Sequence, residues 1–220
     1  MMTKTDLELK HDIDLELRWD PQVNPAQIGV GVDHGSVSLL GQVDTYSEKW
    51  AAERAVKRVS GVRFVAENLT VKLLGEHVRT DSDIAAAMVS ALTWNVLVPK
   101  AVTARVQDGW ITLEGAVTSH YQRKAAEVSV RHLTGVVGVT NSISLIRSAS
   151  SIEVKEKVEQ ALQRQATADA QSIRVEASGG KVTLSGHASS WRAIEDAANA
   201  AWAAPGVFEV DDQVKMAMAG

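Results

Sequence analysis

The segment Gly35-Ser36-Val37-Ser38-Leu39-Leu40-Gly41 returns twice along this chain, as Gly109-Trp110-Ile111-Thr112-Leu113-Glu114-Gly115 and as Gly180-Lys181-Val182-Thr183-Leu184-Ser185-Gly186. All three copies fit the pattern Gly-x-(Val/Ile)-(Ser/Thr)-Leu-x-Gly. A further glycine follows each closing glycine after 20 residues, at Gly61, Gly135 and Gly206. A repeated motif with a repeated spacing predicts three copies of one structural unit.

Each segment has the pattern of a β-strand with one buried face. In the first copy Val37 and Leu39 alternate with two serines, and the other copies keep this two-residue period. A valine- or isoleucine-containing strand precedes each segment. It is joined through Asp33-His34-Gly35, through Gln107-Asp108-Gly109, or through a longer connection, Ala177-Ser178-Gly179-Gly180. Such glycine-containing connections predict β-hairpins.

Nine glycines are expected to have structural roles. Gly35, Gly109 and Gly180 are expected to supply positive φ in the hairpins. Gly41, Gly115 and Gly186 suit a bulge or a close backbone approach where the strand ends. Gly61, Gly135 and Gly206 are expected at the left-handed position that ends a helix. These roles make the glycines poor candidates for a ligand site.

Two helices are expected in each copy. One lies between the closing glycine and the later glycine, spanning about residues 47–59 in the first copy, with small residues spaced for one helical face. Another begins each copy and is marked by apolar residues at i, i+4 and i+8: Leu9, Ile13 and Leu17; Ile84, Met88 and Leu92; Val154, Val158 and Leu162. In the second copy Asp81 and Ser82 are the expected capping residues.

The chain is therefore expected to be an α+β protein of three tandem αββαβ modules, over residues 1–76, 77–147 and 148–220. In each module, two helices pack on one face of a three-stranded mixed sheet. A module of about seventy residues buries only about 60% of its unfolded surface. Contacts between modules are therefore expected to add stability.

Composition narrows the class of protein. Hydrophobic residues make up 45% of the chain, as in globular proteins, and the absence of cysteine excludes disulfides and cysteine-based metal sites. A net charge of −4 does not indicate a nucleic-acid-binding protein, because such proteins present a strongly basic surface. No apolar run reaches the roughly 18 residues of a membrane span. The first residues lack the apolar core of a signal peptide, so a cytoplasmic location is expected, or a periplasmic one if a leader has been removed.

A catalytic, metal or cofactor site is not expected. None of the six histidines has a metal-binding spacing, and neither Gly-x-Ser-x-Gly nor a glycine-rich phosphate loop occurs. The carboxylates Glu8, Asp12, Asp14 and Glu16 fall mostly around a helix away from its apolar stripe. We interpret them as a solvated helix face.

The repeated strand motif, the twenty-residue step to the later glycine and the αββαβ order resemble the BON domain. This family is named for bacterial osmotic-shock and nodulation proteins, and the resemblance covers nearly the whole chain three times. It implies a non-enzymatic binding protein of the bacterial stress response that contacts phospholipid membranes or envelope components. The alternative it implies is a protein-interaction or chaperone-like scaffold.

The middle module carries the basic candidates for contact with an anionic phospholipid surface or another protein. Residues 79–147 hold 7 basic and 5 acidic groups, whereas both flanking modules are net acidic. Four basic residues lie on or near one expected helix, and anionic headgroups attract such groups. They are His120, Arg123, Lys124 and Arg131.

Trp110 is the aromatic candidate in the same module. It alternates out of phase with Ile111 and Leu113, so its indole is expected on the open face of the sheet. An exposed indole beside basic groups suits a bilayer interface. Packing of Trp110 between modules is the alternative.

Three further indoles favour contacts between modules. Trp50, Trp191 and Trp202 lie in the expected second helices of the outer modules. We expect them to help join the three modules into one unit. The open sheet faces and edge strands also leave room for protein partners or self-association.

Overall fold

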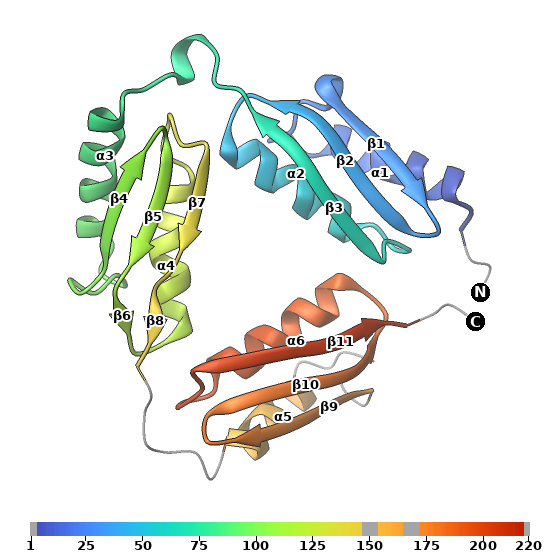
Figure 1. The fold of residues 1–220 in the computed structure, drawn as a ribbon. Coiled ribbons are helices and arrows are strands. Elements are labelled where there is room, and N and C mark those ends of the chain that lie inside the picture. The colour runs from blue at the N-terminus through green and yellow to red at the C-terminus, as the bar shows by residue number, and fades with distance from the viewer. Residues whose placement is uncertain (1–3, 147–153, 165–171, 218–220) are drawn as a thin grey trace.

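The computed structural model describes residues 4–146, 154–164 and 172–217 (Figure 1). Three modules lie in a ring, and each has two helices packed on a three-stranded mixed sheet. The expected α+β class and the αββαβ order are thereby confirmed. Within the described ranges, no helix is both long enough and apolar enough to span a bilayer.

The first module shows the common plan. It contains α1 (Asp6–Trp19), β1 (Ile28–Asp33), β2 (Ser36–Val43), α2 (Tyr46–Arg58) and β3 (Phe64–Val71). The central strand β2 pairs antiparallel with β1 and parallel with β3. Two short 3-10 helices, Pro25–Gln27 and Gly75–His77, precede β1 and follow the module.

The other modules repeat this plan with one interruption. The second contains α3 (Asp81–Trp94), β4 (Thr103–Gln107), β5 (Trp110–Glu114), β6 (Ala116–Val117), α4 (His120–Arg131), β7 (Gly138–Asn141) and β8 (Ser144–Leu145). Its sheet is split, because β5 pairs with β4 and β7 whereas β6 pairs with β8. The third contains α5 (Val154–Arg164), β9 (Ile173–Ser178), β10 (Lys181–Ala188), α6 (Trp191–Ala203) and β11 (Glu209–Met216).

Each module has its own hydrophobic core between sheet and helices. In the first, Val37 and Leu39 of β2 are buried together with Leu9, Ile13 and Leu17 of α1. Small buried residues of the second helices let these helices lie close to their sheets. They are Ala51, Ala52, Ala55 and Val56 in α2, Ala126 and Val130 in α4, and Ala197, Ala200 and Ala201 in α6.

The third hairpin is not longer than the others, so that expectation was wrong. Lys181 pairs with Ser178, which leaves a two-residue loop, Gly179-Gly180. The first two hairpins have loops of the same length, and both residues of all three loops have positive φ. The extra glycine takes the left-handed position that His34 and Asp108 occupy in the other copies.

The capping prediction for the second copy was also wrong by one residue. Thr80 is the N-cap of α3, and it forms a capping box with Asp83. The Asp81 carboxylate instead accepts hydrogen bonds from the backbone N–H groups of Asp108 and Gly109, both at 2.8 Å. Asp6 accepts from the first hairpin in the same way. These aspartates fasten the hairpins to the first helices.

The glycines that close the central strands allow the expected close backbone approach. A Cβ at Gly41 would collide with the carbonyl oxygen of Gln27, and φ is +128°. A Cβ added at Gly115 would collide with the carbonyl oxygen of Ala101, and one added at Gly186 would collide with that of Ser172. A side chain at these positions would therefore push apart the two antiparallel strands.

The later glycines are not helix C-caps, which corrects that assignment. In the first module α2 ends at Arg58, and its C-cap residue Val59 is extended and lies two residues before Gly61. The N–H of Val62 donates to the carbonyl of Val59, so Gly61, at φ +104°, is the third residue of a turn. Gly135 and Gly206 occupy the equivalent turns. Positive φ was the right expectation, but the turn that needs it lies beyond the helix.

We predict that Gly41→Ala lowers the free energy of unfolding by at least about 2 kcal/mol, because the new Cβ meets backbone atoms at a positive φ. The matched control is Gly29→Ala, whose Cβ would lie 3.6 Å from the Leu40 carbonyl oxygen. It should change the free energy by less than about 0.5 kcal/mol. Urea unfolding measures both, and equal losses would contradict the assigned role of Gly41.

Candidate functional site

The second helices α2, α4 and α6 face one another at the centre of the ring (Figure 1). Each buries its small residues against its own sheet, so its opposite face is free to meet the other modules. These outer faces carry aromatic and basic side chains.

Arg131 and Trp50 join the first two modules. The Arg131 guanidinium lies 4.1 Å from the centre of the Trp50 ring, and the Arg131 side chain is only 6% exposed. Its Nη2 pairs with Glu127, whereas its Nε is buried without a hydrogen-bond partner. Ser47 Oγ and His132 Nδ1, 2.9 Å apart, form a second link between these modules.

His120 and Trp202 join the second and third modules. Their rings stack with centroids 4.2 Å apart, and the Arg123 guanidinium lies 5.2 Å from the same indole. Burial lowers the pKa of His120 to about 4, and the nearby charges of Arg123 and Lys124 act in the same direction. The imidazole is therefore neutral at pH 7, and its Nδ1 can accept the hydrogen bond from Arg123 Nη2.

Trp191 and Lys57 join the first and third modules. Trp191 packs against the core of the first module, and the Lys57 ammonium lies 5.5 Å from the centre of its ring. All three indoles expected at module contacts therefore make them. Within the described residues, these contacts link every pair of modules.

Most of the basic candidates thus lie against other side chains. His120, Arg123 and Arg131 contact indoles of neighbouring modules, and of the four only Lys124 is classed as exposed. Their part in contacting a lipid or another partner stays a prediction.

Trp110 lies on the open face of its sheet and is 48% exposed. Its ring crosses Gly138 on the neighbouring strand β7, and its Nε1 donates to Thr140 Oγ1 at 2.8 Å. The basic residue near it is Arg105, which lines the same shallow depression. Helix α4 covers the other face of this sheet. The structure therefore does not bring Trp110 and the basic residues of α4 together into one surface.

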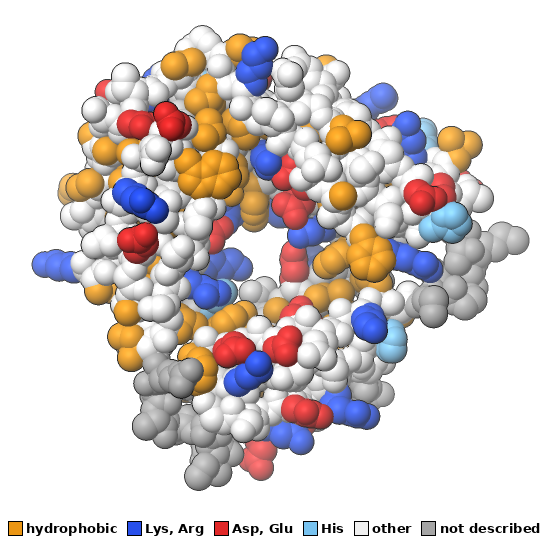
Figure 2. Space-filling model, viewed as in Figure 1, with side chains coloured by type: hydrophobic (Ala, Val, Ile, Leu, Met, Phe, Trp, Pro, Cys, Tyr) orange, Lys and Arg blue, Asp and Glu red, His pale blue; other side chains and the backbone are white. Residues whose placement is uncertain are grey.

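A cleft of about 430 Å³ lies where the three second helices meet. Helix α2 contributes Trp50, Glu53, Arg54 and Lys57, α4 contributes His120, Lys124, Val128 and Arg131, and α6 contributes Glu195, Ala198, Asn199 and Trp202. Charged side chains of both signs border the opening between the modules in the space-filling view (Figure 2). This cleft exists only because three modules meet.

An exposed apolar segment lies at the C-terminal end of α3, and its residues were not among the candidates predicted from the sequence. Trp94 is 84% exposed, Val96 95% and Leu97 40%. The signal was available, because these residues follow Leu92, the last residue of the apolar stripe, and so have no place in the core. Trp19 has the equivalent position in the first module and is 82% exposed, but Asp20, Pro21 and Gln22 follow it.

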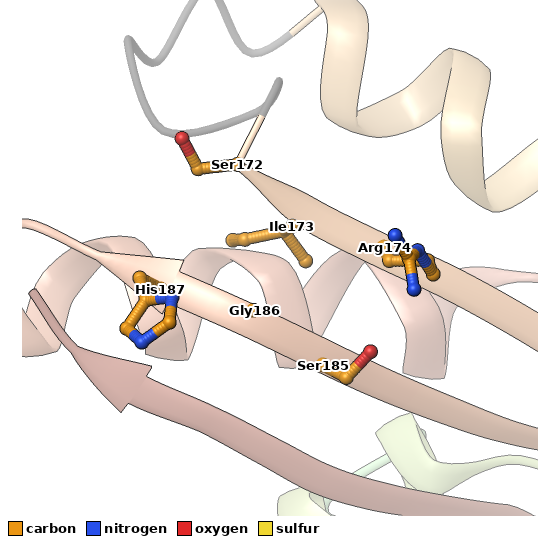
Figure 3. A pocket seen from close by; sticks show the side chains of 6 residues that line it. All are labelled: Ser172, Ile173, Arg174, Ser185, Gly186 and His187. Carbon is orange, nitrogen blue, oxygen red and sulfur yellow. The ribbon is translucent and has the colours of Figure 1, made fainter.

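Another depression, of about 500 Å³, lies along β9 and β10 (Figure 3). Its side chains, among them Arg174, Ser185 and His187, are spread along the two strands and do not converge on one point. A binding or catalytic site requires polar groups that converge. We therefore assign no function to this depression.

Asp6, Asp33 and His34 form one group among the described residues with ligand atoms close enough for a metal ion. Both carboxylate oxygens of Asp6 already accept backbone N–H groups of the hairpin. The His34 N–H is the largest influence on this carboxyl and lowers its pKa. These contacts assign Asp6 a structural role.

Comparison with known proteins identifies three matches to the family model described as BON domain, over residues 5–72, 80–147 and 153–218. No curated protein matches the chain. Among solved structures, the chain is similar to CdsD, a structural protein of the type III secretion system of Chlamydia trachomatis. One CdsD structure has 16% identity and a TM-score of 0.28, with 96% of this chain and 93% of that chain covered. The CdsD C-terminal domain has 15% identity and a TM-score of 0.27, with 98% and 100% covered.

We predict that His120 makes the stability of the chain depend on pH. Its folded pKa is depressed, so between pH 6.5 and about 4 the unfolded state binds a proton that the folded state does not. The contribution of His120 to stability should therefore be fully present above pH 6.5 and be lost toward pH 4. Because the ring is partly exposed to solvent, this loss should be smaller than the full shift implies, on the order of 2 kcal/mol.

The variant His120→Phe keeps a flat ring over Trp202 and removes this titration. Urea unfolding of both proteins at several pH values checks the prediction. The difference in stability between them should change across this window, and parallel pH profiles would refute it.

Proposed function

Because this chain belongs to the BON domain family, we propose that it binds phospholipid membrane surfaces through its middle module. BON domains are generally non-catalytic binding modules associated with membrane and phospholipid binding. The family therefore supports a binding function, and the exposed residues of this chain indicate which surface performs it.

The observation that carries the proposal is the exposed apolar segment of Trp94, Val96 and Leu97. Side chains with this exposure are unfavourable in water, and tryptophan is enriched where a bilayer meets water. Transferring a valine or leucine side chain out of water contributes about 1.5–3 kcal/mol. Three such side chains could offset the cost of association and support a weak, reversible contact.

The charge of the middle module also supports its contact with an anionic membrane surface. Lys100 is exposed six residues after Trp94, and residues 79–147 carry more basic than acidic groups. Each basic residue near an anionic membrane surface contributes about 1 kcal/mol. The apolar segment can therefore insert while Lys100 contacts anionic headgroups.

Trp110 is a weaker anchor than Trp94. Its ring rests on Gly138, and its Nε1 already has a partner in Thr140. The two indoles also belong to opposite ends of the module, because α3 begins beside the hairpin that precedes Trp110 and ends at Trp94. A helix of 14 residues is about 21 Å long. One flat membrane contact would therefore favour the Trp94 end.

A protein-interaction or chaperone-like scaffold of the bacterial stress response is the second candidate. The observation that favours it is the eight-residue edge strand in two of the sheets, β3 and β11. An edge strand can pair with an extended segment of another protein. Suppressed aggregation of a heat-stressed client, without binding to vesicles, would favour this candidate.

We predict that Trp94→Ser/Val96→Ser weakens binding to phosphatidylglycerol vesicles by about tenfold or more, because two exposed apolar side chains no longer leave water. Co-sedimentation measures the binding, and tryptophan emission should shift to the blue only in chains that bind. Phosphatidylcholine vesicles should bind less because they carry no net charge.

The matched control is Leu15→Ser/Trp19→Ser, which removes an exposed leucine and the equivalent exposed indole from the first module. It should change vesicle binding by less than about twofold. Failure of the unmodified chain to bind either vesicle, or equal losses in the two double variants, would reject membrane contact through this segment.

A further inference from the structure

We propose that the cleft between α2, α4 and α6 binds a small phosphate-bearing anion. The cleft is built from all three modules and lies at the centre of the ring, on the outer faces of the second helices. Trp94 lies at the end of a first helix, α3. None of Trp94, Val96 and Leu97 lines the cleft, so this proposal rests on different residues from the proposed membrane contact.

The charge of the cleft is opposite to that of the chain. Four cationic side chains line it, Arg54 and Lys57 from α2 and Lys124 and Arg131 from α4. Glu53 and Glu195 are its only lining carboxylates, so its formal charge is +2 with His120 neutral, whereas the whole chain carries −4. A concave site lined mainly by one sign of charge concentrates ligands of the other sign.

Existing ion pairs leave part of this charge uncompensated. Lys57 pairs with Glu53 at 2.8 Å, and Arg131 pairs with Glu127. Lys124 has no carboxylate partner within ion-pair distance among the described residues, and the contact of Arg54 is the face of Trp50, 4.7 Å from its guanidinium. The depressed pKa of His120, to which Arg123 and Lys124 contribute after burial, agrees with a positive local potential.

Arg54 is held in a way that suits an anion. Its guanidinium lies against Trp50, which also packs against Arg131, so one indole positions two guanidinium groups. Arg54 is exposed, and with its face on the indole it keeps its N–H groups at its edge for bidentate contact with an anion. The Nε of Arg131 is buried without a partner, and leaving a buried donor unpaired is costly. Because this nitrogen is fully buried and Nη2 already pairs with Glu127, Arg131 contributes its positive charge to the cleft and no direct hydrogen bond from Nε.

A phosphate group fits this arrangement better than a carboxylate. Its oxygens point in several directions, so they can accept from cations of α2 and α4 at the same time. The volume of about 430 Å³ leaves room for a small organic group beside the phosphate. A free phosphate compound and a phosphomonoester lipid headgroup share this chemistry.

Inorganic pyrophosphate is the probe for the free anion, used with the full chain in isothermal titration calorimetry at low ionic strength. We expect saturable binding that weakens by about tenfold or more in Arg54→Gln/Lys124→Gln, which removes two charge-assisted contacts. Both residues are exposed, so the fold should persist, and circular dichroism checks it. The matched control Lys10→Gln/Lys72→Gln removes the same charge from exposed positions outside the cleft and should change binding by less than about twofold.

Phosphatidic acid vesicles test the headgroup as the source. Pyrophosphate binding that depends on Arg54 and Lys124 supports the proposal with a free anion. The same dependence seen only with vesicles supports it with a headgroup. The proposal is overturned if neither probe binds in a manner that depends on Arg54 and Lys124, or if the control loses as much. Trp94→Ser/Val96→Ser should bind pyrophosphate normally, which separates this result from the test of membrane contact.

Discussion

The second helix of each module has to pack on two sides, against its own sheet and against the neighbouring modules. The rest of the structure depends on this constraint. A three-stranded sheet with helices on one face leaves each module with a small core. The inner face of α2, α4 and α6 is therefore filled by small residues that pack against the sheet. The outer face carries the indoles and guanidinium groups that join the modules. Aromatic rings that stack on cations tolerate partial solvation, which suits contacts at the border of an open centre.

Because the second helices carry the contacts between modules, the charged cleft and the exposed apolar segment lie on different helices. Charged groups and most of the contacting indoles gather where the second helices meet. The exposed apolar segment lies at the end of a first helix, where no module covers it. The two sites that we propose use different residues, so their ligands would not compete. The three modules are alike in fold, and the first and second both contribute cations to the cleft.

Particular residues show how far a sequence pattern reaches. The period of two in β5 placed Trp110 on the open sheet face correctly, because strand geometry determines on which side a side chain lies. Spacing along α4 likewise placed four basic residues on or near one helix, but it did not reveal that Trp202 and Trp50 cover three of them. The exposure of Trp94 could have been predicted, because Trp94 lies two residues beyond Leu92, where the apolar stripe of the helix ends.

The sequence by itself determined the repeat, the αββαβ order, the buried faces and the need for glycine at the strand ends. These features follow from interactions within about seventy residues, and periodicity and spacing describe such interactions directly. The tertiary structure alone decided which indole meets which cation and that a charged cleft forms at the centre. Arg54 and Lys124 are seventy residues apart and belong to different modules. Their proximity depends on how whole modules pack together, and that packing leaves no period in the sequence.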